Sequence, residues 1–291
     1  MTTTITNTLR VPGAQLHYEV RGSGPLLLLI CGGVYDADGY AGLAHHLTDR
    51  YTVLTYDRRG NSRSPLDGPP APQSIQEHGD DAHRLLSAVA ADRGETAAVF
   101  GNSSGAIIAL ELAARHPEQV HTVVAHEPPL FELLPDRDHW RTVISDVERA
   151  FRSQGPGPAG QILGAALQMG GGAEEDGRVP GGAEAPAEPD PETAAVQARM
   201  GRNMEFFIGY EVPPFARYRP DLATLRSGST RIVPAVGELS AATEPPYYRA
   251  ALVVAEELDT TAAVFPGDHG GFGSDPALFA ARLAEVLADQ K

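Results

Sequence analysis

Residues 97–114 constrain the fold of this chain more than any other stretch. The first four are apolar and predict a short buried strand, and residues 106–114 have helical character. Between them lies Gly101-Asn102-Ser103-Ser104-Gly105, a Gly-x-Ser-x-Gly turn. Glycine is expected at both ends of this turn because strand and helix must approach closely there. A strand, a sharp turn and a helix in this order would expose the hydroxyl of Ser103 as a candidate nucleophile.

Short apolar strands alternate with helices in the rest of the chain. We predict strands at residues 8–11, 15–20, 26–30, 51–56, 120–125, 231–237 and 261–265, and helices at 40–47, 74–91, 247–257 and 276–289. This alternation predicts an α/β fold, in which a mostly parallel, eight-stranded sheet is covered by helices on both faces. Residues 26–30 are continuously apolar, as expected of a central strand.

The alternation stops at residues 131–228. The periodic pieces of this segment are helical, at residues 140–151 and 192–207. The sequence therefore predicts a core domain made of residues 1–130 and 229–291, with residues 131–228 inserted as a helical lid. Within the lid, residues 155–190 are rich in Gly, Ala, Pro and Glu and predict a mobile stretch without a core of its own.

Composition argues against several classes of partner. The net charge is -15, from 23 basic and 38 acidic residues, which disfavours binding to nucleic acid or to an anionic membrane. Cys31 is the single cysteine, so an internal disulfide and a Cys-rich metal site are excluded. The N-terminal residues resemble no signal peptide, and no apolar run is long enough to span a membrane. We expect a cytoplasmic protein without cofactor or metal, and leave open whether it forms a homodimer.

Three motifs together resemble the α/β-hydrolase superfamily. They are Gly101-Asn102-Ser103-Ser104-Gly105, Tyr56-Asp57-Arg58-Arg59-Gly60-Asn61-Ser62-Arg63-Ser64 and Gly267-Asp268-His269-Gly270-Gly271-Phe272. The resemblance covers both parts of the predicted core domain and none of the lid. A serine hydroxyl needs an oriented base to take its proton. In this superfamily the nucleophile, the acid and the histidine follow in that order along the chain, which implies Ser103 as nucleophile and His269 as base.

The resemblance also implies an oxyanion hole, a pair of N–H donors for the negative charge of the tetrahedral intermediate. One donor is the amide of Ser104, which lies at a helix N-terminus where N–H groups are free. The second is expected from Cys31-Gly32-Gly33, where relatives have His-Gly-x. Gly33 is the preferred residue and Gly32 the next. Cys31 stands where relatives have histidine, and we expect it to be a buried apolar filler.

The acid departs from the common pattern. Many relatives place an Asp in a Gly-x-x-Asp sequence after the strand at residues 231–237, but here Ser240 holds that position and cannot carry a charge. Glu127, after the strand at residues 120–125, is the favoured replacement. The zearalenone-type lactonases and one subgroup of haloalkane dehalogenases use that position. Glu238 is the alternative, and neither carboxylate is a third outcome. Asp268 is discounted because it lies in the same turn as His269.

The motifs imply acyl transfer on an ester or lactone carbonyl through a Ser-His-Glu triad. The lid is rich in apolar and aromatic residues and no cluster of Arg or Lys marks an anion site, so we expect a bulky, uncharged, hydrophobic small molecule. The most specific substrate that the position of Glu127 implies is a resorcylic macrolactone such as zearalenone. The candidate substrate-binding residues are Gly32, Val34, Leu134, Trp140, Phe207 and Tyr210.

Other functions remain open at this point. A C–C bond hydrolase shares the fold but usually keeps the late Asp. A cofactor-free oxygenase or perhydrolase would keep His269 and depend less on Ser103. A ligand-binding protein without catalysis is disfavoured by the intact serine turn, histidine and oxyanion loop.

Overall fold

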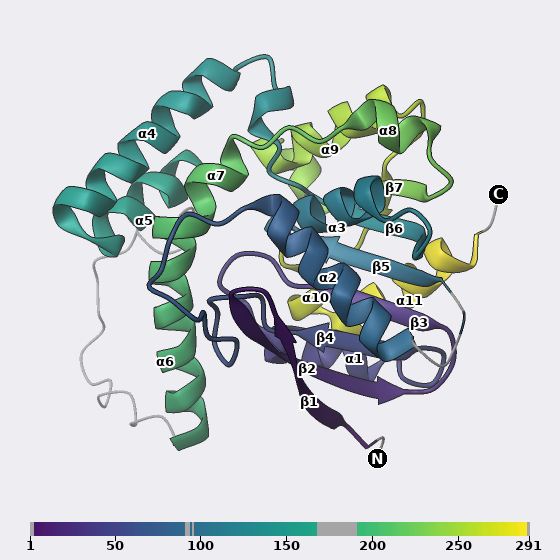
Figure 1. Cartoon of the computed structure of the whole chain (residues 1–291). Helices are drawn as coiled ribbons and strands as arrows, with labels where there is room; N and C mark the ends of the chain where they lie inside the picture. The colour runs from purple at the N-terminus through teal and green to yellow at the C-terminus, as the bar shows by residue number, and fades with distance from the viewer. Residues whose placement is uncertain (1–2, 91–93, 95, 168–190, 290–291) are drawn as a thin grey trace, which may run out of the picture.

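The computed structural model describes residues 3–90, 94, 96–167 and 191–289, and within them eight strands form one sheet (Figure 1). Its order is β1 (Ile5–Val11), β2 (Ala14–Gly22), β4 (Thr52–Tyr56), β3 (Leu26–Ile30), β5 (Ala97–Asn102), β6 (Val120–His126), β7 (Arg231–Gly237) and β8 (Ala263–Phe265). β1 and β2 are antiparallel to their neighbours, and the other pairs are parallel. The predicted mostly parallel sheet is confirmed.

Helices cover both faces of the sheet. One face carries α2 (Ile75–Ala90), α3 (Ser104–Arg115) and α9 (Pro246–Glu257), and the other carries α1 (Ala41–His45) and α11 (Pro276–Ala288) (Figure 1). The central strand β3 shows why both faces are needed. Leu26, Leu28 and Ile30 belong to one apolar cluster, and Leu27 and Leu29 belong to the other.

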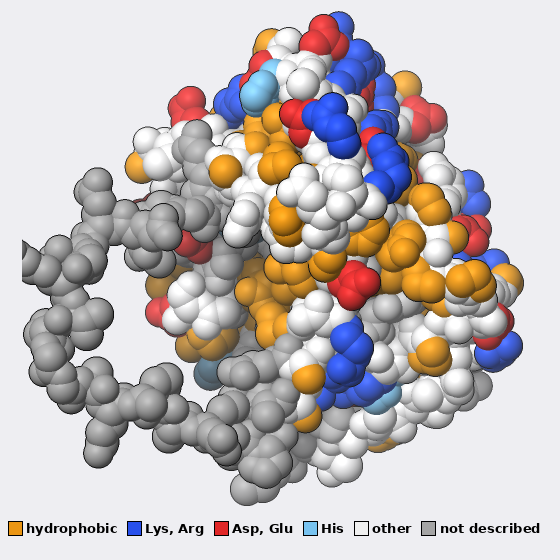
Figure 2. Space-filling view, turned by 90° about the vertical axis from the view of Figure 1, so that its left-hand side faces the viewer, with side chains coloured by type: hydrophobic (Ala, Val, Ile, Leu, Met, Phe, Trp, Pro, Cys, Tyr) orange, Lys and Arg blue, Asp and Glu red, His pale blue; other side chains and the backbone are white. Residues whose placement is uncertain are grey.

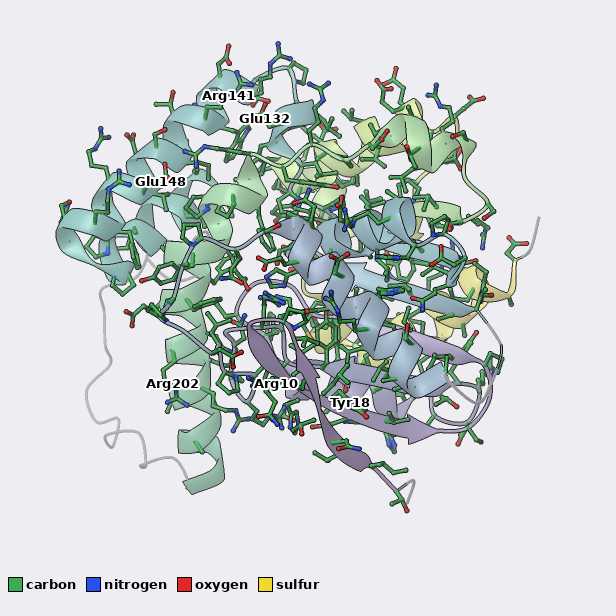
Figure 3. All side chains as sticks on the ribbon, viewed as in Figure 1. Arg10, Tyr18, Glu132, Arg141, Glu148 and Arg202 are labelled. Carbon is green, nitrogen blue, oxygen red and sulfur yellow. The ribbon has the colours of Figure 1, made fainter. Side chains whose placement is uncertain are left out.

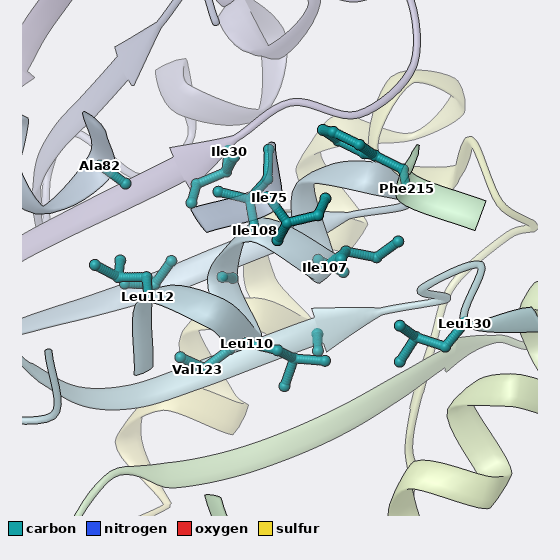
Figure 4. Packing of buried hydrophobic residues seen from close by; sticks show 14 of the residues in the cluster. Ile30, Ile75, Ala82, Ile107, Ile108, Leu110, Leu112, Val123, Leu130 and Phe215 are labelled. Carbon is teal, nitrogen blue, oxygen red and sulfur yellow. The ribbon is translucent and has the colours of Figure 1, made fainter. Parts of the chain in front are cut away.

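Helix α3 is the most deeply buried helix around the site. Ile107, Ile108, Leu110 and Leu112 are all fully buried, and Figure 4 shows them among Ile30 of β3 and Val123 of β6. Each such side chain contributes about 1.5–3 kcal/mol on burial. Because packing holds α3 on nearly every side, its N-terminus, where Ser103 and Ser104 lie, has a fixed position at the carboxyl end of β5.

The segment between β6 and β7 is helical in its described residues, and we call it the insertion. Its helices are η2 (Phe131–Leu133), α4 (Arg137–Gln154), α5 (Pro156–Ala166), α6 (Pro191–Phe206), the π-helical turn η3 (Phe207–Glu211), α7 (Val212–Ala216) and α8 (Leu222–Ser227). Figure 1 shows α4, α5 and α6 projecting to one side of the sheet. Ion pairs connect its elements to one another, for example Arg141 with Glu132 at 2.6 Å (Figure 3).

One prediction for the insertion is wrong. Residues 156–166 form helix α5, although their composition predicted a mobile stretch without a core of its own. Proline begins this helix, where its fixed φ is favourable. Ala159 and Leu163, one turn apart, are buried in the cluster that contains Ile144 and Val147 of α4. Tertiary packing therefore compensates for the poor helix propensity of the glycines in α5. Residues 168–190, where a mobile stretch was also expected, lie outside the described residues.

The remaining elements are short. They are η1 (Ala37–Tyr40), which together with α1 replaces the single helix predicted at residues 40–47, η4 (Leu239–Ala242) and α10 (Gly271–Ser274). The other predicted strands and helices are present with ends shifted by a few residues. In the described part of the chain, no helix combines the length and the apolar character needed to span a membrane.

Candidate active site

Ser103 lies in a strained turn directly after β5. Its backbone has φ 56° and ψ -126°, a conformation that residues other than glycine rarely adopt. The Ser103 N–H donates to the carbonyl of His126 at 2.9 Å, and the Ser103 carbonyl accepts the N–H of Ala106 at 2.9 Å. A Cβ at Gly101 would overlap the carbonyl of Gly105, so the predicted need for glycine is explained by the crossing of strand and helix. Ser103 lines a large cavity.

Glu127 follows β6 directly and also has a positive φ, 48°. Its carboxylate is fully buried, with Oε2 2.8 Å from Nδ1 of His269 and Oε1 2.9 Å from the N–H of Gly237, which donates to it. Burial alone would raise the pKa of Glu127. The hydrogen bond from His269, the charges of His126 and His269, and the Gly237 N–H outweigh burial and hold the pKa below its usual range. An ionised Glu127 accepts the Nδ1 proton, which leaves Nε2 of His269 as the basic nitrogen.

Neither of the other two candidate carboxylates forms a hydrogen bond with the ring of His269. Glu238 has an exposed side chain, and its backbone N–H donates to the carbonyl of Phe265 at 2.8 Å. Asp268 accepts the N–H of Gly270 at 2.9 Å, within its own turn. Ser240 is buried and lines the cavity. Of the two candidate glutamates, the structure therefore brings Glu127 to His269 and leaves Glu238 in solvent.

Two residues that the sequence did not single out support the histidine. Asn102 Nδ2 lies 3.0 Å from the carbonyl oxygen of His269, to which it donates, and 3.0 Å from Nδ1 of the buried His126. The ring of Tyr247 lies 4.0 Å from that of His269, centroid to centroid, and lines the cavity. Burial, with a smaller effect of the Glu127 and Asp268 charges, raises the pKa of Tyr247 to about 12. Asn102 is the second residue of the serine motif, directly before the nucleophile, which was a signal for it, but nothing in the sequence marked Tyr247.

The two predicted oxyanion donors lie side by side. The loop of residues 31–34, which we call the oxyanion loop, follows β3, and the N–H of Gly33 donates to Oγ of Ser104 at 2.9 Å. Gly32 packs against the serine turn, where a Cβ would overlap the carbonyl of Asn102. The N–H of Ser104 lies at the N-terminus of α3. In this conformation the Gly33 N–H donates its hydrogen bond to the Ser104 hydroxyl. An oxyanion would have to take the place of that hydroxyl as the acceptor.

Cys31 is fully buried, as expected of a filler. Its thiol donates to the carbonyl of Asp36 at 3.0 Å, and burial raises its pKa far above the usual range. A thiol in this environment is not ionised and is a poor nucleophile.

The cavity has a volume of about 1300 Å³ and is bounded by the sheet and the insertion. Ser103, Ser104 and His269 contribute to one side, and Gly160, Leu163, Met204, Phe207, Ile208 and Phe215 contribute from the insertion. Figure 2 shows the face that carries the insertion, with hydrophobic side chains gathered across its middle. Three of the large exposed hydrophobic residues, Tyr35, Met204 and Leu239, also line the cavity.

Half of the predicted substrate residues line this cavity. Gly32, Val34 and Phe207 do, whereas Leu134, Trp140 and Tyr210 do not. Trp140 is 3% exposed and stacks on Phe131, and Leu134 is buried in the same cluster. Tyr210 packs against Phe151 and Phe206. These three side chains stabilise the insertion itself, because its helices need a core of their own to stand on the sheet.

The charged side chains of the cavity are acidic. Glu205 and Asp268 contribute to its lining, and no Lys or Arg is found among the described residues that line it. The remaining lining is dominated by apolar and glycine residues. Such a cavity favours an uncharged, hydrophobic molecule over one with a carboxylate or phosphate group.

A second cluster of ionisable residues lies apart from this cavity. Ligand atoms of His83, His116 and Glu118 lie within 4.8 Å of one another. The two imidazole rings are stacked, with centroids 3.8 Å apart and an angle of 15° between the planes. The in-plane lone pairs of two parallel rings do not converge on one ion, so this arrangement does not form a chelating site without a rotation of one ring.

Comparisons with known proteins agree with this fold. The model of the alpha/beta hydrolase family matches residues 27–282. The chain is 37% identical over 295 residues to the uncharacterized hydrolase YraK of Bacillus subtilis (strain 168), which covers 99% of this chain and 98% of that protein. Over 110 residues, 38% of each chain, it is 34% identical to the 2-(acetamidomethylene)succinate hydrolase of Mesorhizobium japonicum.

Solved structures give the same result. A thermophilic esterase from Thermogutta terrifontis superimposes with a TM-score of 0.69 at 18% identity, covering 99% of this chain and 98% of that one. The enol-lactonase from Burkholderia xenovorans LB400 has a TM-score of 0.65 at 16% identity, covering 97% and 100%. With the family model matched over most of its length, this chain belongs to the alpha/beta hydrolase family.

Proposed function

We propose that this protein is a serine hydrolase that cleaves an ester or lactone of a bulky, uncharged, hydrophobic small molecule. One observation carries the proposal: Ser103 lies on a strained turn in an apolar cavity that also contains His269, whose Nδ1 is 2.8 Å from the buried carboxylate of Glu127. Strained backbone at both Ser103 and Glu127 supports a functional role for each.

The first half of the reaction forms an acyl-enzyme. Nε2 of His269 takes the proton of the Ser103 hydroxyl as Oγ attacks the carbonyl carbon of the substrate. The N–H groups of Ser104 and Gly33 donate to the oxyanion, and Glu127 stabilises the imidazolium. The tetrahedral intermediate then breaks its bond to the leaving oxygen, which receives the proton from His269. In a lactone this alcohol stays attached to the acyl group.

The second half releases the acyl group. His269, again neutral, takes a proton from a water molecule that attacks the acyl carbonyl, and the same two N–H groups hold the oxyanion. Collapse of this intermediate returns the proton to Ser103 and leaves a carboxylic acid, which loses its proton to solvent near neutral pH and becomes a carboxylate anion. The acidic lining residues Glu205 and Asp268 would favour departure of this anion by repulsion.

The cavity and the neighbours support this substrate class. A volume of about 1300 Å³ accommodates a drug-sized molecule, and the apolar lining contributes binding through the hydrophobic effect. The similar structures include an esterase and an enol-lactonase, both of which act on acyl–oxygen bonds. Among esters and lactones of this kind, the position of Glu127 makes a resorcylic macrolactone such as zearalenone the first substrate whose hydrolysis should be assayed.

Turnover of p-nitrophenyl esters tests the proposal. Wild-type protein should release p-nitrophenol, and Ser103→Ala and His269→Ala should each lower kcat by roughly 10³-fold or more. Binding should be retained, because neither substitution changes the apolar lining of the cavity. Wild-type rates that match the solvent background across acyl chains of different length, or a Ser103→Ala variant as active as the wild type, would contradict it.

A further inference from the structure

A fully buried ion pair lies behind the oxyanion loop. Nη2 of Arg58, in the loop after β4, is 2.7 Å from Oε2 of Glu211, the last residue of η3, and both side chains have an exposed fraction of 0%. Asn61 Nδ2 donates to the other carboxylate oxygen at 2.9 Å. Removing two charges from water is costly unless additional hydrogen bonds complete the arrangement. The remaining hydrogen bonds of Arg58 connect this ion pair to the oxyanion loop.

Arg58 binds the oxyanion loop at two carbonyls. Its Nη1 donates to the carbonyl of Cys31 at 2.6 Å, and its Nη2 donates to the carbonyl of Gly33 at 2.7 Å. These carbonyls belong to the peptide units on either side of the one that contains the Gly33 N–H. Peptide units are planar, and glycine residues otherwise rotate freely between them. Holding both neighbouring units restricts the direction in which the Gly33 N–H points.

A second residue of the insertion holds the next carbonyl. Asn203 of α6, which is 1% exposed, donates from Nδ2 to the carbonyl of Val34 at 2.9 Å. Its Oδ1 accepts the N–H of Ser62 at 2.8 Å. The insertion thus holds this loop at Val34 through Asn203 and at Cys31 and Gly33 through Glu211 and Arg58.

We infer that Glu211, acting through Arg58, is a positioning residue that orients the Gly33 N–H toward the oxyanion. This inference rests on the proposed function. Neither Glu211 nor Arg58 is among the described residues that line the cavity, so neither contacts the substrate directly. Their effect is therefore on stabilisation of the tetrahedral intermediate, and the insertion contributes to catalysis as well as to the walls of the cavity.

The chain contains a matched control in the same loop. Arg59 forms a second pair with the buried Asp81 of α2, with Nε 2.7 Å from Oδ2 and Nη2 2.8 Å from Oδ1. The Arg59 side chain also lies 3.2 Å from Oε1 of Glu77 and donates to the carbonyl of Pro12 in the β1–β2 turn, and none of these contacts is with the oxyanion loop. Glu211→Gln and Asp81→Asn each remove one buried carboxylate charge from a paired arginine, so both are expected to lower the melting temperature.

The test compares kcat, KM and the affinity for an aryl boronic acid, which forms a tetrahedral adduct with an active serine. For Glu211→Gln, kcat for a p-nitrophenyl ester should fall about 10- to 100-fold and the boronate should bind more weakly by a similar factor, with KM changed less than about threefold. Asp81→Asn should leave all three values near those of the wild type. Equal effects of the two substitutions on kcat, or a Glu211→Gln effect confined to KM or stability, would overturn the inference.

Arg58→Lys provides a second variant if Glu211→Gln does not fold. Lysine keeps a cation beside Glu211 but lacks the planar fork that bonds both carbonyls. Its kcat should fall by a similar factor, and a wild-type kcat would overturn the inference. Failure of the proposed function has a different signature, since the wild type itself would then neither turn over esters nor bind the boronate, and the inference would fall with it.

Discussion

Oε2 of Glu127 lies 2.8 Å from Nδ1 of His269, although 142 positions separate the two residues along the chain. The second carboxylate oxygen accepts the N–H of Gly237 at 2.9 Å, at the end of β7, the strand after which many relatives carry an Asp. The side chain of Glu127 thus extends from the end of β6 across to the neighbouring strand end. A glutamate is long enough to reach the histidine from there, although Ser240 stands where many relatives have an acid.

Replacing Glu127 by Gln should lower kcat by roughly 10²- to 10⁴-fold with little change in KM. The amide removes the charge that stabilises the imidazolium, and its NH₂ group can donate to Nδ1, which favours the wrong tautomer of His269. Steady-state hydrolysis of a p-nitrophenyl ester measures both constants.

Glu238→Gln is the control for this prediction. Glu238 is exposed, so its substitution should leave kcat within about twofold of the wild type. If Glu238→Gln lost activity by orders of magnitude and Glu127→Gln did not, the assignment of the acid would be reversed.

Ser104→Ala should raise kcat about 2- to 10-fold. The Ser104 hydroxyl accepts the Gly33 N–H at 2.9 Å, and an oxyanion must displace it before that N–H can donate to the substrate. A net hydrogen bond of about 0.5–1.5 kcal/mol is lost in that exchange, and alanine removes the competition. Pre-steady-state acylation rates measure the effect directly. A fall of tenfold or more would instead assign the hydroxyl itself as an oxyanion donor.

Gly160→Leu should select against large acyl groups. Gly160 lines the cavity, and a Cβ built there meets no heavy atom within 4 Å, so a leucine side chain can occupy the space of the substrate. We expect kcat/KM for a long-chain p-nitrophenyl ester to fall about tenfold, since each displaced methylene contributes about 0.8 kcal/mol. The acetate ester should be affected less than about twofold.

The control for size selection is Gly160→Ala. Both substitutions improve the propensity of α5, alanine by about 1 kcal/mol, so neither should unfold the helix. Equal losses on acetate and long-chain esters in the leucine variant would show that α5 does not bound the acyl site.

Stability should fall as the pH decreases from 6.5 toward 4 because of His126. Burial, with a contribution from the His269 charge and against those of Glu127 and Asp268, lowers the pKa of His126 from 6.5 to about 4. In this range the unfolded chain binds a proton that the folded protein does not, so the free energy of unfolding increases with pH. Urea unfolding should show a loss of about 2 kcal/mol between pH 7 and pH 5 from this group.

His126→Gln isolates that contribution. Glutamine has an oxygen that can accept from Asn102 Nδ2, which lies 3.0 Å from Nδ1 of His126, and it does not titrate. The variant should lose about 2 kcal/mol less than the wild type over the same pH interval, whatever its absolute stability. An identical pH dependence in the two proteins would contradict the assignment.

The sequence predicted those parts of the fold that local pattern determines. The continuous apolar run of β3 and the glycines around Ser103 carry their structural reasons within a few residues. The serine at position 240, where many relatives have an Asp, was itself a signal that another carboxylate such as Glu127 replaces it. The contact of Glu127 with His269 is present in the structure, and its catalytic role stays a prediction.

Features that depend on tertiary packing could not be predicted from the sequence. An apolar side chain such as Trp140 can face a cavity or the core of the insertion, and helical periodicity does not distinguish the two. Arg58 and Glu211 are 153 positions apart, in a charged loop and a π-helical turn, and neither segment indicates that they meet. Helix α5 was missed because its burial against α4 outweighs its glycine content.

The most direct test of the account is the mass of the protein after treatment with an alkyl fluorophosphonate, followed by peptide mapping. We expect one adduct per chain, on Ser103. His269→Ala and Glu127→Gln should each slow its formation, and a bound boronic acid should prevent it. An unlabelled protein that still turns over its substrate, as a cofactor-free oxygenase would, or an adduct on a residue other than Ser103, would contradict it.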